Sequence, residues 1–155
     1  MKLAAKTDID VPVGFVYESL ADHTSWEHEA AERGIDVRRA FEQAIAGPGD
    51  EWSVTLPYRG KLVTVALRLV QTHPDSRLDF DFKSNAIEGD LQIAAMALSP
   101  RRTRLNVVID IRPRTLASRV FLNTLRLAKG RVETRFAARL QQIGFRILAR
   151  YSRTR

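Results

Sequence analysis

Alternation of apolar and polar side chains dominates the middle of the chain. Apolar residues recur at about every second position in six runs, least regularly in the fifth, and the runs cover residues 35–42, 51–58, 61–71, 77–83, 87–98 and 103–111. A period of two places successive side chains on opposite faces of a strand, so each run predicts a strand with one apolar face. Only short turn segments separate the runs, and short connections join antiparallel neighbours. The pattern therefore predicts a six-stranded antiparallel meander.

The segment before the meander predicts one more strand and two short helices. Residues 2–11 alternate in the same way and give a seventh strand. Pro12 fits the first turn of a short helix, because its ring fixes a helical φ and that turn needs no N–H donor. A second short helix is predicted over residues 24–33, and Gly34 is expected to end it.

The segment after the meander has a helical period. Thr115 is a good N-cap, and beyond it apolar residues recur every three or four positions; they are Phe121, Leu125, Ala128, Val132, Phe136, Leu140, Ile143 and Ile147. This spacing predicts one long amphipathic helix. A sheet with one apolar face needs a cover, and this is the only predicted element long enough. We therefore expect an α+β protein whose sheet curls around the helix and buries Val132 and Phe136.

This element order resembles the START-like, or SRPBCC, superfamily, which includes birch-pollen-allergen-like proteins and polyketide cyclases. The local resemblance lies in residues 9–17 (IDVPVGFVY) and in the following Asp22 and Trp26; in element order it spans residues 3–149. It implies a helix-grip fold, in which a seven-stranded curved antiparallel sheet wraps around a long C-terminal helix, with two short helices after the first strand. It also implies a cavity that accepts lipids, sterols or aromatic polyketides. We expect a single domain over residues 1–150 and a basic tail over residues 151–155.

Composition removes several classes of chemistry. The 155 residues fit one domain, and the absence of cysteine excludes disulfides and thiolate ligands. His23 and His28 are five positions apart, which does not align two metal ligands on one helix face. We therefore expect no metal and no cofactor. Lys6, Asp8 and Asp10 lie where a signal peptide needs an apolar run, so we expect a cytoplasmic protein.

Aromatic side chains on the predicted inner faces are the candidate ligand-binding residues. The set consists of Trp26, Phe41, Trp52, Tyr58, Phe80, Phe82 and Phe121. Together they favour the binding of a hydrophobic small molecule such as a lipid, a quinone or an aromatic compound, with transport or sequestration as the roles that such binding would serve. In the alternation of its strand, Arg39 falls at a position whose side chain points inward. It requires an acidic ligand head or a carboxylate as partner, unless a bulge places it in water.

A metal-independent enzyme of the cyclase or dehydratase type is the alternative function. It needs an acid or base that faces the cavity, and His28 with Tyr17 or Tyr58 is the best set that the sequence offers. The competing interpretation places His28 in solvent between Glu27 and Glu29. No catalytic residue is identified.

Positive charge is concentrated in the C-terminal third. Residues 112–155 hold 12 of the 25 basic residues and one acid, Glu133. Arg131, Arg135, Arg139, Arg146 and Arg150 form a stripe along the predicted helix. The stripe either pairs with acids of the protein itself, such as Asp79 and Asp81, or is solvated, or it contacts an anionic membrane surface. Nucleic acid is not an expected partner, because the sequence offers no exposed aromatic platforms beside the basic residues.

Overall fold

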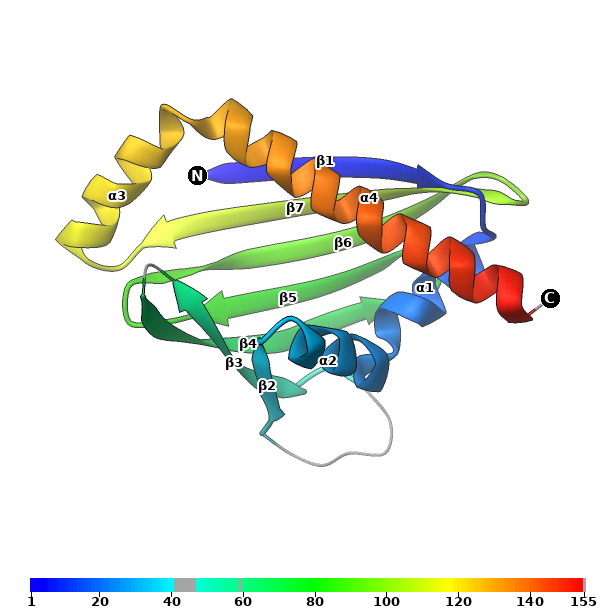
Figure 1. The fold of residues 1–155 in the computed structure, drawn as a ribbon, viewed down its shortest axis with the longest axis horizontal. Helices are drawn as coiled ribbons and strands as arrows, with labels where there is room; N and C mark the ends of the chain where they lie inside the picture. Colours follow the sequence, from blue (N-terminus) through cyan, green and yellow to red (C-terminus); the bar gives the residue numbers. More distant parts are fainter. Residues whose placement is uncertain (41–46, 59, 155) are drawn as a thin grey trace.

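A computed structural model describes residues 1–40, 47–58 and 60–154, and it contains a seven-stranded sheet (Figure 1). The side chain of Tyr58 lies outside the described part. The strands are β1 (Lys2–Ile9), β2 (Asp36–Arg39), β3 (Glu51–Tyr58), β4 (Lys61–His73), β5 (Arg77–Lys83), β6 (Ile87–Ser99) and β7 (Arg102–Pro113). All neighbours are antiparallel, in the order β1-β7-β6-β5-β4-β3-β2.

The predicted meander is confirmed, and the N-terminal strand joins its far edge. β1 pairs with β7, with Lys2 opposite Asp110 and Ile9 opposite Thr103. The buried Thr103 hydroxyl donates a hydrogen bond of 2.7 Å to the carbonyl of Val11. This bond fastens the chain to the sheet at the point where it leaves β1 for the helices.

Two short helices follow β1, as predicted. They are α1 (Val13–Ala21), which begins after Pro12, and α2 (His23–Glu32). The Asp22 carboxylate caps α2 by accepting a hydrogen bond of 3.3 Å from the Ser25 amide. Gly34 ends α2 with a φ of 78°, a left-handed conformation that glycine adopts without a steric cost.

The predicted long C-terminal helix is confirmed, but its expected start at Thr115 is wrong, because the chain after Thr115 forms two helices. They are α3 (Leu116–Arg126) and α4 (Lys129–Thr154), and Figure 1 shows α3 turned sharply away from the axis of α4. Both helices keep the same apolar period, so the periodicity did not reveal the bend at Leu127 and Ala128. No proline marks it, and Gly130 in the first turn of α4 is the one local signal. Helix α4 ends at Thr154, so residues 151–154 of the predicted basic tail are helical.

Two apolar clusters form the core, on two parts of the sheet. In the first, Leu140 and Ile147 of α4 pack on residues of β1, β6 and β7. Gly144 permits this approach, because a Cβ atom there would lie 3.3 Å from the Ile9 side chain. Val132 and Phe136 are only partly buried, which corrects the expectation for them.

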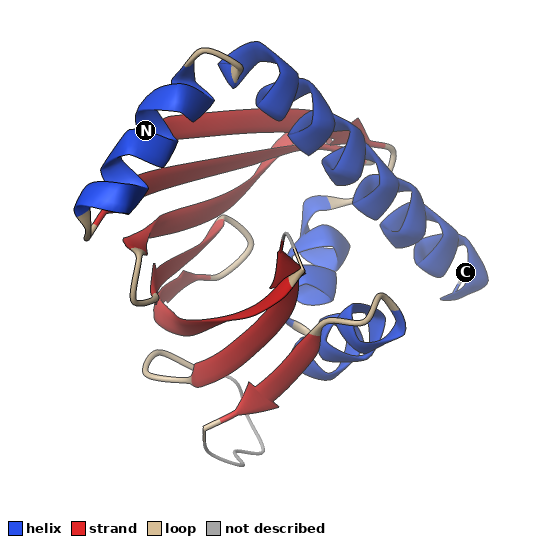
Figure 2. Ribbon diagram, turned by 60° about the vertical axis from the view of Figure 1, so that its left-hand side comes forward, coloured by secondary structure: helices blue, strands red, loops and turns tan. Residues whose placement is uncertain are grey.

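The second cluster lies on β3, β4 and β5 and is covered by α1 and α2. Its buried residues are Trp52, Leu69, Leu78 and Phe80. Figure 2 shows the curved sheet with α4 across one part of it and the short helices over another. Leu20, Leu91 and Ile93 pack against both clusters, so the two covers meet above β5 and β6.

The contact of α4 with the sheet can be tested by truncating Leu140, which is 3% exposed. Leu140→Ala should lower the free energy of unfolding by about 2–5 kcal/mol, because it removes buried apolar atoms and leaves a cavity. The matched control Gln142→Ala, at an exposed position of the same helix, should change it by less than about 0.5 kcal/mol. Urea unfolding followed by circular dichroism measures both, and a loss below about 1 kcal/mol for Leu140→Ala would contradict the packing described.

Candidate functional site

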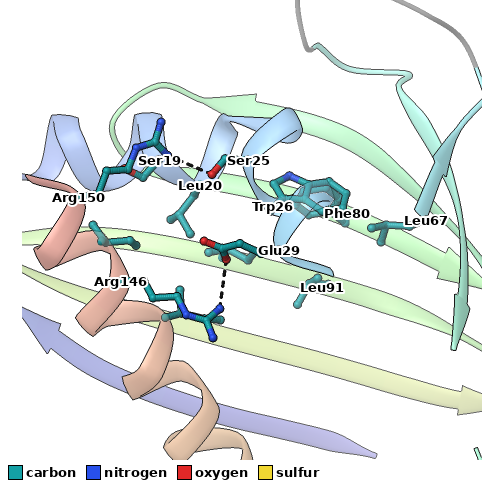
Figure 3. Close-up of a pocket in the computed structure, with 13 residues that line it drawn as sticks. Ser19, Leu20, Ser25, Trp26, Glu29, Leu67, Phe80, Leu91, Arg146 and Arg150 are labelled. Carbon is teal, nitrogen blue, oxygen red and sulfur yellow. Dashed lines mark hydrogen bonds and ion pairs between the residues drawn. The ribbon is translucent and has the colours of Figure 1, made fainter. Parts of the chain in front are cut away.

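A cavity of about 260 Å³ lies where the two helical covers meet (Figure 3). Its floor comes from β4, β5 and β6, one wall from α4, and the other wall from α1 and α2. The lining residues are Ser19, Leu20, Ser25, Trp26, Glu29, Leu67, Phe80, Leu91, Ile93, Ile143, Arg146, Ile147 and Arg150. Eight of these thirteen side chains are apolar.

The polar lining residues join α4 to α2. Arg146 forms an ion pair of 3.3 Å with Glu29. Arg150 forms one of 2.7 Å with Asp22 and donates a hydrogen bond of 3.3 Å to the Ser25 hydroxyl. The hydrogen bond from Arg150 is the main reason why the pKa of Asp22 lies below its ordinary value.

A wider hollow of about 830 Å³ lies beside the cavity. The two share Ser25, Glu29, Arg146 and Arg150, so these four residues stand between the apolar interior and the outer hollow. The outer hollow adds charged residues of α2 and α4, among them Glu32 and Arg153. The lining residues therefore change from mainly apolar to mainly charged at these four residues.

Trp26 is held in the cavity wall by the buried His23. The Trp26 indole N–H donates a hydrogen bond of 3.2 Å to Nδ1 of His23, and the imidazole packs against Trp52 with ring centroids 4.8 Å apart. An accepting Nδ1 assigns the proton of the neutral ring to Nε2, which lies 3.8 Å from the Asp50 carboxylate. Burial lowers the pKa of His23 below its ordinary value. His23 is thus a neutral support for the wall.

Glu27 ties α2 to the sheet beside this histidine. One carboxylate oxygen of Glu27 accepts hydrogen bonds from the Trp52 indole, at 2.9 Å, and from Arg39, at 2.6 Å. Arg39 also donates to the Thr24 hydroxyl at 3.2 Å. The partner expected for an inward-facing Arg39 is therefore a carboxylate of the protein itself.

The structure places the predicted ligand-binding aromatics in several environments. Trp26 and Phe80 line the cavity. Trp52 is buried behind them, with its ring centroid 5.3 Å from that of Trp26 and 6.3 Å from that of Phe80. Phe41 lies outside the described residues, as does the side chain of Tyr58.

Phe82 and Phe121 lie away from the cavity lining. Phe82 pairs with Gly89 of β6 and its ring covers that glycine, where an added Cβ would collide with the ring and with the Asp110 carbonyl. Phe121 is half-buried on α3. Neither side chain is among those that line the cavity.

The candidate acid and base residues His28 and Tyr17 are not among the residues that line the cavity. The side chain of His28 is 80% exposed and lies 3.7 Å from Glu32, which agrees with the solvated interpretation and removes His28 as the acid or base of the alternative enzyme. Tyr17 packs against the Trp52 cluster, where burial raises the pKa of its hydroxyl. Among the described residues, no group of three or more His, Cys, Asp or Glu side chains could hold a metal ion.

Reasoning from aromatic residues missed the aliphatic half of the lining. Leu91 and Ile93 of β6 and Ile143 and Ile147 of α4 form much of the cavity surface. The helical period of the last two residues was visible in the sequence and could have assigned them. The pairing of Arg146 and Arg150 with α2 was not visible, because it joins residues more than 100 positions apart.

The arginine stripe divides into two parts. Arg146 and Arg150 pair with acids of α2, and not with Asp79 and Asp81, whose partners are Arg77 and Arg68. Within the described part of the chain, no ion pair is recorded for the three exposed arginines nearer the start of α4, which are Arg131, Arg135 and Arg139. No described helix is long and apolar enough to cross a membrane.

Comparison with known proteins finds similarity in structure and not in sequence. No family model and no curated protein matches the chain. Zhui aromatase/cyclase from Streptomyces sp. R1128 superimposes with a TM-score of 0.68 at 15% identity, over 99% of this chain and 94% of that chain. The birch allergen homologue Ara h 8.0201 gives a TM-score of 0.61 at 12% identity, over 100% of this chain and 99% of that chain.

A START superfamily protein from Mycobacterium smegmatis gives a TM-score of 0.59 at 10% identity, over 86% of this chain and 95% of that chain. All three structures match nearly their whole length, so the likeness covers the sheet and the helices together. Identities this low describe the fold alone. The chain therefore has the helix-grip fold, and its resemblance to the START-like, or SRPBCC, superfamily is confirmed at the level of the fold.

Proposed function

We propose that this protein binds a hydrophobic small molecule in the cavity between the sheet, α4 and α2. The observation that carries the proposal is the lining itself, in which eight apolar side chains face a space of about 260 Å³. Water makes few favourable contacts with an apolar cavity, whereas an apolar ligand that enters the cavity is removed from its unfavourable contact with bulk water. The likeness to an aromatase/cyclase and to a START superfamily protein supports the same class of function.

The lining favours a compact ligand with one polar end. The cavity volume is just below the roughly 300–1,000 Å³ of sites that hold drug-sized ligands. Four of the five residues that bring hydroxyl or charged groups to the lining lie beside the outer hollow; they are Ser25, Glu29, Arg146 and Arg150. A ligand can therefore keep its apolar body among Leu67, Phe80 and Leu91 and direct a polar group toward the outer hollow.

The cavity meets the outer hollow at the charged boundary between α2 and α4. The ion pairs that join them have side chains 33–44% exposed. Pairs this exposed contribute only about 0–1 kcal/mol each, so they can break during ligand exchange without a large barrier. The outer hollow then leads directly into the apolar interior.

Filling the cavity with a protein side chain tests the proposal. Leu67→Trp should weaken binding of the neutral apolar dye N-phenyl-1-naphthylamine at least tenfold, because the indole occupies the ligand's place. The matched control Leu62→Trp, at a position of β4 that is 77% exposed, should bind as the wild type does. Fluorescence titration measures the affinities, and thermal unfolding shows that each variant is folded.

Two results would contradict ligand binding in this cavity. One is a wild type that binds neither this dye nor any lipid extracted with the purified protein. The other is a Leu67→Trp variant that is folded and binds the dye with unchanged affinity.

Protonation of His23 should weaken both the fold and the cavity wall. The unfolded chain protonates this histidine as pH falls below about 6.5, whereas the buried ring stays neutral to a lower pH. The contribution of the neutral His23 ring to the free energy of unfolding is thus complete above pH 6.5. It is lost as pH falls toward the lowered pKa, with a slope of up to about 1.4 kcal/mol per pH unit. The dye affinity should decrease only at the lower end of this window, as pH reaches the lowered pKa of the folded protein, because a protonated Nδ1 cannot accept the Trp26 hydrogen bond.

His23→Gln and His28→Gln form a matched pair for this measurement. Urea unfolding and dye titration between pH 5 and pH 8 should show a flatter pH dependence for His23→Gln, which lacks the titrating ring. His28→Gln should keep the wild-type dependence, because His28 is solvent-exposed. The lowered pKa of Asp22 acts in the same direction, but only near and below its ordinary value of 3.8, so the two windows are separate. Equal slopes in all three proteins would show that His23 does not control the wall.

A metal-independent cyclase or dehydratase is the second candidate, and the position of Glu29 favours it over other enzyme classes. Glu29 supplies the one carboxylate among the described lining residues, and the serine hydroxyls of Ser19 and Ser25 line the same cavity. A carboxylate beside an apolar cavity can exchange a proton with a bound carbonyl compound. Incubation with a poly-β-ketone, followed by mass spectrometry, separates the candidates. Loss of water that Glu29→Gln abolishes without loss of binding would favour the enzyme.

A further inference from the structure

The outer face of α3 exposes three large aliphatic side chains. Leu116 is 80% exposed, Val120 66% and Leu127 91%. At 3.6 residues per turn these positions lie within about 40° of one another around the helix axis. Leu127 follows the last residue of α3 but keeps a helical conformation, with φ −65° and ψ −25°. The three side chains therefore form one stripe on the surface.

This stripe is not the surface by which α3 attaches to its own protein. Ser118 and Leu122 are buried, and Phe121 and Leu125 are half-buried, on the opposite side of the helix. The helix is also well formed at its start, because Thr115 and Ser118 cap it reciprocally. One apolar side of α3 therefore packs against the rest of the protein, and no described residue covers the second apolar side.

Positive charge surrounds the exposed stripe. Residues 111–132 include six basic residues and no acid. Arg112 pairs with Asp90, but within the described part of the chain no ion pair is recorded for Arg119, Arg126, Lys129 or Arg131. Arg119 and Arg126 border the stripe along one side of the helix. We call the three aliphatic residues together with these four cations the docking face.

We infer that the docking face binds the surface of an anionic lipid membrane. Aliphatic side chains flanked by cations suit the boundary between lipid head groups and acyl chains. There the aliphatic side chains leave water, and the cations contact lipid phosphates and carboxylates. A symmetric contact with a second copy would bring the same cations face to face, which opposes dimerisation. This inference does not depend on the ligand cavity.

Vesicle co-sedimentation tests the inference with the intact protein. The probes are vesicles of phosphatidylcholine alone and of phosphatidylcholine with phosphatidylserine, at low and high salt. The wild type should bind the anionic vesicles, and salt should weaken this binding. Leu116→Ser with Leu127→Ser should reduce the partition coefficient at least tenfold, and Arg119→Gln with Arg126→Gln should reduce it about thirtyfold.

The matched control uses two exposed arginines outside the docking face. Arg135→Gln with Arg139→Gln removes the same charge from α4 and should change the partition coefficient less than threefold. All six residues changed in these three variants are exposed, so each variant should keep the wild-type circular dichroism spectrum and melting temperature.

Three results would overturn the inference. The first is a wild type that does not sediment with anionic vesicles at low salt. The second is an equal loss of binding in the Arg135 and Arg139 control, which would place the contact on α4. The third is a dimer, detected by light scattering, that Leu116→Ser with Leu127→Ser dissociates, because a second copy would then cover the stripe.

Discussion

A sheet of seven strands presents more apolar surface than one helix can cover, and the rest of this structure depends on that mismatch. Strands lie about 4.8 Å apart, and a helix with its side chains is about 10 Å wide, so α4 covers two or three strands. It packs chiefly on β1, with Gly144 at the closest approach. The strands beyond β6 need a second cover, which α1 and α2 provide. The cavity lies where the two covers meet, so its position follows from the width of the sheet.

Within the second cover, specific polar contacts hold α2 in place more than apolar burial does. Helix α2 has one large apolar side chain, Trp26, and cannot be positioned by a hydrophobic face alone. Glu27 bonds to Trp52 and Arg39, and His23 bonds to Trp26. Buried polar groups are costly unless they are paired, so these bonds favour one position of the helix. The same bonds fix the cavity wall.

The strands could be predicted because a period of two and short turns leave few alternatives, whereas the cavity was expected only from the resemblance in element order. The bend between α3 and α4 could not be predicted, because the apolar period continues across Leu127. Spacing on α2 did contain usable information: His23 lies three residues before Trp26 and shares its side of the helix, whereas His28 lies two residues after it and faces away. The pairing of Arg39 with Glu27 is set by the pairing of β2 with β3, which brings Arg39 to Trp52, and no local pattern encodes it.

The basic C-terminal third is not one electrostatic feature, although its composition suggests that it is. Arg146 and Arg150 meet Glu29 and Asp22 because α4 crosses the sheet toward α2, and pairing leaves them little charge to offer an external partner. The bend turns α3 away from that crossing, so the cations of α3 remain far from the acids of α2 (Figure 1). One change of chain direction thus separates arginines that close a cavity from those that remain available to an external surface.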